Sequence, residues 1–278
     1  MAKSINRLSR RRARNLLLFI LTVSALTAAE TAHTLALRRS SILTGWLLFA
    51  LVLILAAYHF RKRIPVLPLG SAATWLQFHI YAGLLTFVVF LQHVQWRIPN
   101  GIFESLLAAA YLGVFFSGLF GLVISRVFPR RLTARGGEVI FDQIPRKRRV
   151  LRAQVEELVL HGLVESNSTA LPELYAERLR PFFSEVRDFW PHLMHSARLR
   201  NNLLLEMEWQ SPYMNERERA VAETISQLIR EKDDLDYHYA HQAALKYWLF
   251  AHVPLTHALL VFACAHAAIV YAYSGGLR

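Results

Sequence analysis

Apolar residues fill five long runs of the sequence, and polar residues are concentrated between these runs. A helix needs about 20 apolar residues to cross the hydrocarbon core of a bilayer. All five runs are long enough, and no segment shows the alternation with a period of two that predicts a half-buried strand. The pattern therefore predicts membrane-spanning helices over residues 15–37, 42–60, 75–96, 102–125 and 248–273.

The segment between the fourth and fifth runs, residues 127–247, is polar and is predicted to be an aqueous insertion. Apart from Glu30 and Glu104, every Asp and Glu of the chain lies within it. Apolar residues recur there at spacings of three and four, which is typical of helices. The helical stretches expected from this spacing are residues 149–163, 172–190 and 198–209.

The end of this insertion is expected to continue into the fifth span as one helix. No Gly or Pro occurs from residue 216 to residue 250, and Asn215 is a suitable N-cap. The predicted fold class is therefore all-α. It consists of an integral membrane bundle of five transmembrane helices, from residues 1–126 and 248–278, with a helical insertion over residues 127–247.

Composition and charge support the membrane interpretation and predict an orientation. Of the 278 residues 54% are hydrophobic and 19% charged, and the formal net charge is +12. The basic residues flank the apolar runs, which favours a topology signal over a nucleic-acid surface. Six Lys and Arg precede the first span, three follow the second and eight follow the fourth, against four on the opposite side. The positive-inside rule then predicts the cytoplasmic (inner) membrane, with the N-terminus and the insertion in the cytoplasm and the C-terminus outside.

Four histidines within the spans form the main candidate site. His79 and His93 lie fourteen residues apart in the third span, and His252 and His266 lie fourteen apart in the fifth. Fourteen positions return to within about 40° of the same helix face after a rise of about 21 Å. The two spans run in the same direction, so we expect His79 level with His252 near the cytoplasmic side and His93 level with His266 near the outer side. Two level pairs of imidazoles suit the axial ligation of two haem irons.

This arrangement resembles the two-haem, four-helix membrane cytochromes. These include the respiratory cytochrome b of quinol-oxidising complexes and the transmembrane part of ferric reductases, which likewise uses its third and fifth spans. The resemblance rests on the His79–His93 and His252–His266 spacing and covers about half of the chain. It implies two haems b, each held by one histidine from each span. No GxGxxG motif for a nucleotide cofactor occurs in the sequence.

Other residues are candidates for supporting roles in such a site. Arg61 and Lys246 on the cytoplasmic side and Arg97 on the outer side are expected to pair with haem propionates, or to anchor the helix ends. Glu30 and His33 are three residues apart on the first span and share a face near the outer surface. They form a possible quinol site, because a quinol releases protons as it gives up electrons. An interfacial hydrogen-bonded pair is the alternative.

The single cysteine, Cys264, excludes a disulfide framework, a CxxCH haem attachment site, a multi-cysteine zinc site and a cysteine-ligated iron–sulfur cluster within this chain. In the insertion, His238 and His241 follow a cluster of aspartates, and a solvated helix face is expected there in preference to a metal site.

The function expected is that of a dihaem b-type cytochrome subunit of an oxidoreductase complex. It would carry electrons between a membrane quinone pool and a redox protein such as a c-type cytochrome, with the insertion docking a cytoplasmic partner. Whether the chain is itself an enzyme stays open. The alternatives are a histidine-lined metal or proton transporter and a haem-free membrane scaffold subunit. Histidines near the two ends of the spans favour haem over a metal path, which would place mixed ligands near the bilayer centre.

Overall fold

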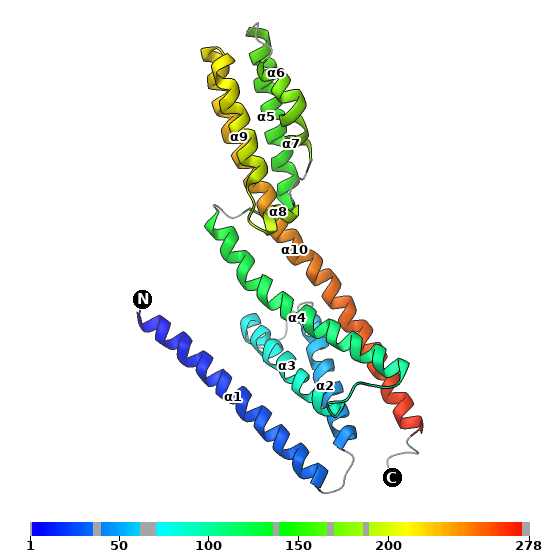
Figure 1. The fold of residues 1–278 in the computed structure, drawn as a ribbon. Coiled ribbons are helices and arrows are strands. Elements are labelled where there is room, and N and C mark those ends of the chain that lie inside the picture. Colours follow the sequence, from blue (N-terminus) through cyan, green and yellow to red (C-terminus); the bar gives the residue numbers. More distant parts are fainter. Residues whose placement is uncertain are drawn as a thin grey trace. The chain divides into compact units, whose positions relative to one another are not determined.

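The computed structural model describes residues 2–35, 40–61, 71–135, 139–165, 170–185 and 189–273. Every regular element within these ranges is helical, and they contain no strand (Figure 1). In chain order the elements are α1 (Ala2–Leu35), α2 (Ser40–Arg61), α3 (Ala72–His93), α4 (Ile102–Ala134), η1 (Phe141–Gln143), α5 (Ile144–Glu165), α6 (Ala170–Leu174), the π-helix η2 (Tyr175–Leu179), α7 (Arg180–Ser184), α8 (Phe189–Leu193), α9 (Arg198–Gln210), η3 (Ser211–Tyr213) and α10 (Glu216–Tyr273).

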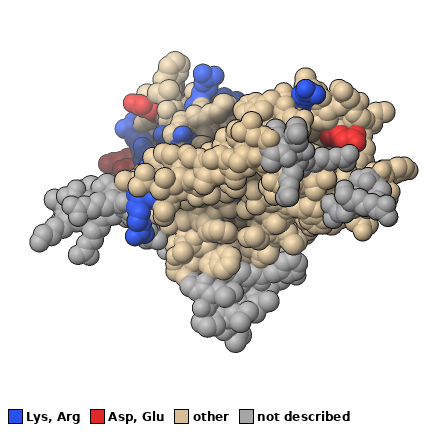
Figure 2. All heavy atoms as spheres, turned by 90° about the horizontal axis from the view of Figure 1, so that it is seen from below, with Lys and Arg blue, Asp and Glu red and all other residues tan. Residues whose placement is uncertain are grey.

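Five of the described helices, α1, α2, α3, α4 and α10, are long and apolar enough to cross a membrane. This confirms the predicted all-α bundle, and the chain is a multi-pass membrane protein. Large apolar side chains such as Leu17, Phe120 and Val261 are more than half exposed on these helices. Uncharged residues also cover most of the face seen in Figure 2. Exposed apolar surface of this extent is expected where helices contact lipid.

The chain divides into two compact units. Unit 1 comprises Met1–Leu122 and Phe250–Arg278, and unit 2 comprises Val123–Leu249, so α4 and α10 contribute residues to both. The buried core of unit 1 takes one side chain from each of four helices. These are Val52 of α2, Phe90 of α3, Tyr111 of α4 and Leu259 of α10.

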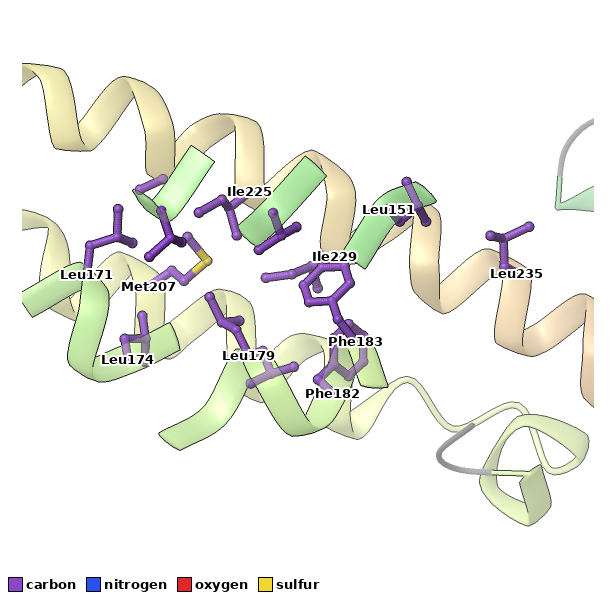
Figure 3. Packing of buried hydrophobic residues seen from close by; sticks show 14 of the residues in the cluster. Leu151, Leu171, Leu174, Leu179, Phe182, Phe183, Met207, Ile225, Ile229 and Leu235 are labelled. Carbon is purple, nitrogen blue, oxygen red and sulfur yellow. The ribbon is translucent and has the colours of Figure 1, made fainter. Parts of the chain in front are cut away.

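Unit 2 has a separate hydrophobic core between α10 and the shorter helices. Ile225 and Ile229 of α10 are fully buried and meet Leu151 of α5, Phe182 of α7 and Met207 of α9 (Figure 3). Burial of the apolar side chains in this core is the main favourable contribution to the stability of unit 2.

The helix ends agree with the sequence expectation for α10 and differ from it for α4 and α3. As expected, α10 runs without a break from the insertion into the fifth span, and Asn215 caps it. The Glu218 backbone N–H donates to Asn215 Oδ1 at 2.8 Å, and the Asn215 N–H donates to Glu218 Oε2 at 2.9 Å, which is a complete capping box. Helix α4 continues past its expected end to Ala134, and α3 ends earlier than expected, at His93.

Candidate functional site

His93 occupies the last position of α3, immediately before a left-handed turn. Gln95 and Trp96 have φ values of 52° and 58°, and the Trp96 N–H donates to the Leu91 carbonyl at 3.1 Å. A turn of this kind ends a helix by satisfying a carbonyl that has no partner within it. The imidazole is therefore carried at a defined helix end.

The His93 ring is oriented by helix α2. Its Nδ1–H donates to the Ser41 carbonyl oxygen at 3.0 Å. A carbonyl can only accept, so the proton is on Nδ1 and the lone pair is on Nε2, which is the state that binds a metal. A Cβ atom at Gly45 would lie 2.9 Å from His93 Cε1, so glycine is needed beside the ring.

His266 of α10 lies opposite His93, and we call the two residues the His93 pair. Their ring centres are 6.3 Å apart and their planes are inclined at 87°. A metal bound by two imidazole nitrogens at about 2 Å each separates the ring centres by about 6 Å. Phe103 of α4 lies nearly parallel to the His266 ring, with 6.3 Å between ring centres. The spacing of the His93 pair would thus allow both imidazoles to bind one metal ion.

A cavity of about 540 Å³ opens beside the His93 pair, and both histidines line it. We call it the His93 cavity. Helices α2, α3, α4 and α10 contribute to its walls, which are mostly apolar, and the charged groups among the lining residues are Arg97 and Glu104. Cofactor sites have volumes of about 300–1,000 Å³ and this mixture of apolar walls with few polar groups.

His79 and His252 form the second predicted pair, which we call the His79 pair. His252 Nδ1 and Ser117 Oγ share a hydrogen bond of 3.2 Å, and the Tyr58 ring lies 5.1 Å from the His79 ring. Within the described residues, His79 Nδ1 is buried without a hydrogen-bond partner. A Cβ atom at Gly83, one turn along α3, would meet nothing within 4 Å, so there is space beside this pair.

A polar and aromatic layer lies between the levels of the two pairs. The Tyr111 hydroxyl donates to Thr86 Oγ1 at 3.0 Å, and the Thr86 hydroxyl donates to the Gly83 carbonyl at 2.7 Å. The Tyr111 ring is stacked on Phe90 with 4.3 Å between ring centres. The hydroxyl groups are satisfied within the layer, so Tyr111 and Thr86 are held in fixed positions.

Of the three residues predicted to pair with haem propionates, the structure places one at the His93 cavity. Arg97 is exposed and lines the His93 cavity. The side chain of Arg61 lies outside the part of the chain that the structure describes. The Lys246 ammonium is 3.2 Å from Asp142 Oδ1 and 3.9 Å from the centre of the Phe141 ring, so it already has a partner within unit 2.

Glu30 and His33, the predicted quinol site, lie on α1. This helix is joined to α3 by a hydrogen bond of 3.3 Å from Gln92 Nε2 to Thr27 Oγ1. Neither Glu30 nor His33 lines the His93 cavity. His33 Nδ1 is buried and has no hydrogen-bond partner among the described residues. Helix α1, which carries this pair, therefore contacts α3 through Thr27, but the pair itself does not line the cavity.

Sequence analysis did not identify Ser41, Gly45, Tyr111 or Ser117 as neighbours of the histidines. A glycine or serine in a transmembrane helix is most often there for close packing. The local sequence does not distinguish a glycine or serine that packs against another helix from one that contacts a histidine of that helix. The signal needed is which residues face each other across the bundle.

The expectation of a solvated helix face at residues 233–241 is wrong. Asp233, Asp236 and His241 are at most 3% exposed, and Lys232 is fully buried. The Lys232 ammonium contacts the Asp236 carboxylate and donates to the Glu185 carbonyl at 2.9 Å. Burial lowers the pKa of Lys232, and the Asp236 charge opposes that effect.

Two arginines from outside α10 compensate the charge of Asp233. Its Oδ2 atom is 3.2 Å from Arg200 Nη1 and 3.5 Å from Arg135 Nη1. Across the described ranges, no group of three or more His, Cys, Asp or Glu is placed to hold a metal ion. Asp233 and Asp236 are therefore held in buried ion pairs.

Comparison of the chain with protein-family models, with curated proteins and with solved structures gave no match.

Proposed function

We propose that this chain is a dihaem b-type cytochrome subunit that carries electrons across a membrane. One haem iron would be held by the His93 pair and the other by the His79 pair. The observation that carries the proposal is the His93 pair itself. Its ring centres are 6.3 Å apart, and both rings line a cavity of cofactor size.

The orientation of the ligands gives further support. Ser41 holds the Nδ1–H of His93, and Ser117 bonds Nδ1 of His252. Partners of this kind select the tautomer and fix the ring, and they are typical of metal-ligating histidines. The buried Nδ1 atom of His79 and the space beside Gly83 are consistent with a group that fills the second site.

When bound, each haem would supply reversible one-electron chemistry. The chain's own residues would bind the haem iron, shield the haem from water and compensate the charge of its propionates. The apolar walls of the His93 cavity would exclude water, which helps to set the reduction potential. Arg97, exposed at this cavity, would pair with a propionate. The electron partners proposed are a membrane quinone and a redox protein such as a c-type cytochrome.

The proposed orientation places the N-terminus and unit 2 in the cytoplasm, and the membrane is the cytoplasmic one. The support is the excess of Lys and Arg before the first span and after the second and fourth spans. Unit 2 would then be available to dock a cytoplasmic partner.

The test is the haem content of the protein purified from its native membrane. Pyridine haemochrome analysis should give about two haems per chain. His93→Ala and His266→Ala should each remove the same haem, and His79→Ala and His252→Ala should each remove the other.

His257→Ala is the matched control. His257 also lies in the apolar part of α10, but its Nδ1–H donates to the Val253 carbonyl of its own helix at 2.7 Å. This variant should keep both haems. A haem-free wild-type protein, or equal haem loss in the control, would refute the proposal.

A further inference from the structure

The boundary between apolar and polar sequence lies inside unit 2, on both of its long helices. On α4 the apolar run ends at Ser125 and is followed by exposed Arg126. On α10 the apolar run begins at Trp248, beside exposed Tyr247. Aromatic and basic residues at the end of an apolar run mark the membrane interface. The height of any part of unit 2 above the bilayer can therefore be measured along these two helices.

Helix α8 and the turn that follows it are attached to these two helices close to that boundary. Arg131 Nη1 of α4 donates to the Leu193 carbonyl at 3.4 Å, and the His195 ring lies 6.1 Å from the ring of His241 on α10. Arg131 is about 9 Å beyond Ser125 along α4, and His241 is about 10 Å before Trp248 along α10. These heights are upper limits, because helix tilt shortens them. The headgroup layer is itself about 5–8 Å deep, so the expected level of α8 is at or just above the outer edge of that layer.

Two large apolar side chains project from α8 and the residue that follows it. Trp190 is 70% exposed and Met194 is 75% exposed. The turn that carries them is well defined, since the Ser196 N–H donates to the Pro191 carbonyl at 2.8 Å and His195 has a φ of 64°. Exposed apolar groups on a fixed backbone favour contact with an apolar phase.

A second apolar projection comes from a different segment at the same level. Ile140 is 56% exposed, and the preceding residue is anchored to α10 by a hydrogen bond of 2.8 Å from Gln242 Nε2 to the Val139 carbonyl. Gln242 is about 9 Å before Trp248 along α10. Two independent segments thus expose apolar side chains near the end of the apolar runs.

Exposed cations accompany these side chains. Arg126 and Arg130 are exposed one turn apart on α4, and Arg146, Lys147 and Arg149 are exposed on α5 in the same unit. Each Lys or Arg near a membrane of anionic lipids contributes about 1 kcal/mol of attraction. The combination of Trp, apolar side chains and arginine is that of an interfacial membrane contact.

We propose that Ile140, Trp190 and Met194, together with Arg126 and Arg130, form a lipid-docking surface that binds unit 2 to the adjacent leaflet. The apolar side chains enter the headgroup layer, and the arginines bind the phosphates of anionic phospholipids. The occupant is the bilayer that the chain already spans. This assignment does not depend on the proposed haems.

The test uses the full chain with Cys264→Ser and one reporter cysteine. Met194→Cys carries an environment-sensitive dye, and Trp209→Cys carries the same dye as the matched control. Trp209 is 78% exposed, but neighbouring Met207 is bonded to Ser226, which is about 33 Å before Trp248 along α10. The dyes are compared in nanodiscs of brominated and unbrominated phosphatidylcholine, with and without phosphatidylglycerol.

Brominated lipid should quench the dye at position 194 at least about 3-fold more than the dye at position 209. Trp190→Glu should remove most of this difference, and Trp209→Glu should leave it unchanged. Leaving out phosphatidylglycerol should reduce the quenching about 2-fold, because the arginines lose their partners.

Equal quenching at the two positions would overturn the proposal. So would a dye at position 194 that brominated lipid leaves unquenched but that native membranes shield from iodide, which would assign the surface to a partner protein. Unchanged quenching in phosphatidylcholine alone would overturn the role given to anionic headgroups. Circular dichroism of each labelled variant checks that it is folded.

Discussion

Gly45 offers the most direct perturbation of the His93 pair without removing a histidine. A Cβ atom at this position would lie 2.9 Å from His93 Cε1 and 3.3 Å from its Nδ1. Carbon atoms do not approach this closely, so Gly45→Ala must displace the ring. The ring cannot move freely, because its Nδ1–H donates to the Ser41 carbonyl at 3.0 Å. The displacement should therefore disturb both the orientation and the tautomer of the proposed ligand.

Two energetic costs arise when the methyl group of Gly45→Ala displaces the His93 ring. Inserting a methyl group into a packed site costs about 1–3 kcal/mol. A hydrogen bond contributes about 1 kcal/mol net, and part of that loss is already included in the strain. A total of about 1–3 kcal/mol corresponds to a 5- to 150-fold weaker hold on the group that His93 binds. The His79 pair lies at another level of the bundle and should not change.

The assay is haem stoichiometry together with a redox titration that resolves the two haems. Gly45→Ala should lose most of one haem, or shift the potential of that haem alone. Gly118→Ala is the matched control, because its Cβ atom would lie 3.5 Å from His252 Cε1, which is an ordinary contact. This control should keep both haems. Two fully occupied haems with unchanged potentials in Gly45→Ala would refute the assignment of His93 as a ligand in this orientation.

Three further predictions test other parts of the structure. The 87° inclination of the His93 and His266 rings should give the oxidised protein a highly anisotropic low-spin signal in electron paramagnetic resonance, and a signal typical of parallel ligand planes would contradict it. Asp236→Asn should destabilise unit 2 by about 3–5 kcal/mol, because it leaves the buried Lys232 ammonium uncompensated. Because burial lowers the folded-state pKa of Lys232, the unfolded state binds more protons, so the stability of this variant should rise with pH towards the ordinary lysine pKa; thermal unfolding at several pH values measures this, and the opposite slope would contradict it. A cysteine at Ser211 in a Cys264→Ser background should resist a membrane-impermeant thiol reagent in intact cells, and ready labelling would invert the proposed orientation.

The fold was predictable where one physical constraint acts on a long stretch of chain. Lipid requires about 20 apolar residues per helix, and all five spans could be located from that requirement. The N-cap of α10 was equally accessible, because Asn215 and Glu218 have the spacing of a capping box. The early end of α3 was not predictable. It depends on Gln95 and Trp96 adopting positive φ, and neither is a residue that favours that conformation.

The histidine pairs show what spacing can and cannot predict. A separation of fourteen residues places His79 and His93 on one face of α3, and the structure places His93 opposite His266. The groups that orient the rings are Ser41 at the start of α2 and Ser117 in the middle of α4. Neither helix has a sequence pattern that points to these serines. Such contacts depend on the packing of the bundle, which a single sequence does not specify.

The error over the aspartates of α10 has the same origin. Charged residues on a helix favour water, and for most surface helices that inference is sound. Here Asp233 and Asp236 meet Arg200, Arg148 and Lys232, so they are buried as ion pairs. Periodicity reports how polar a helix face is, but not whether water or an opposite charge satisfies it. Mispairing of these buried residues would leave a charge uncompensated, which is strongly destabilising. The helices around α10 in unit 2 are therefore held in register by these pairs as well as by their apolar core.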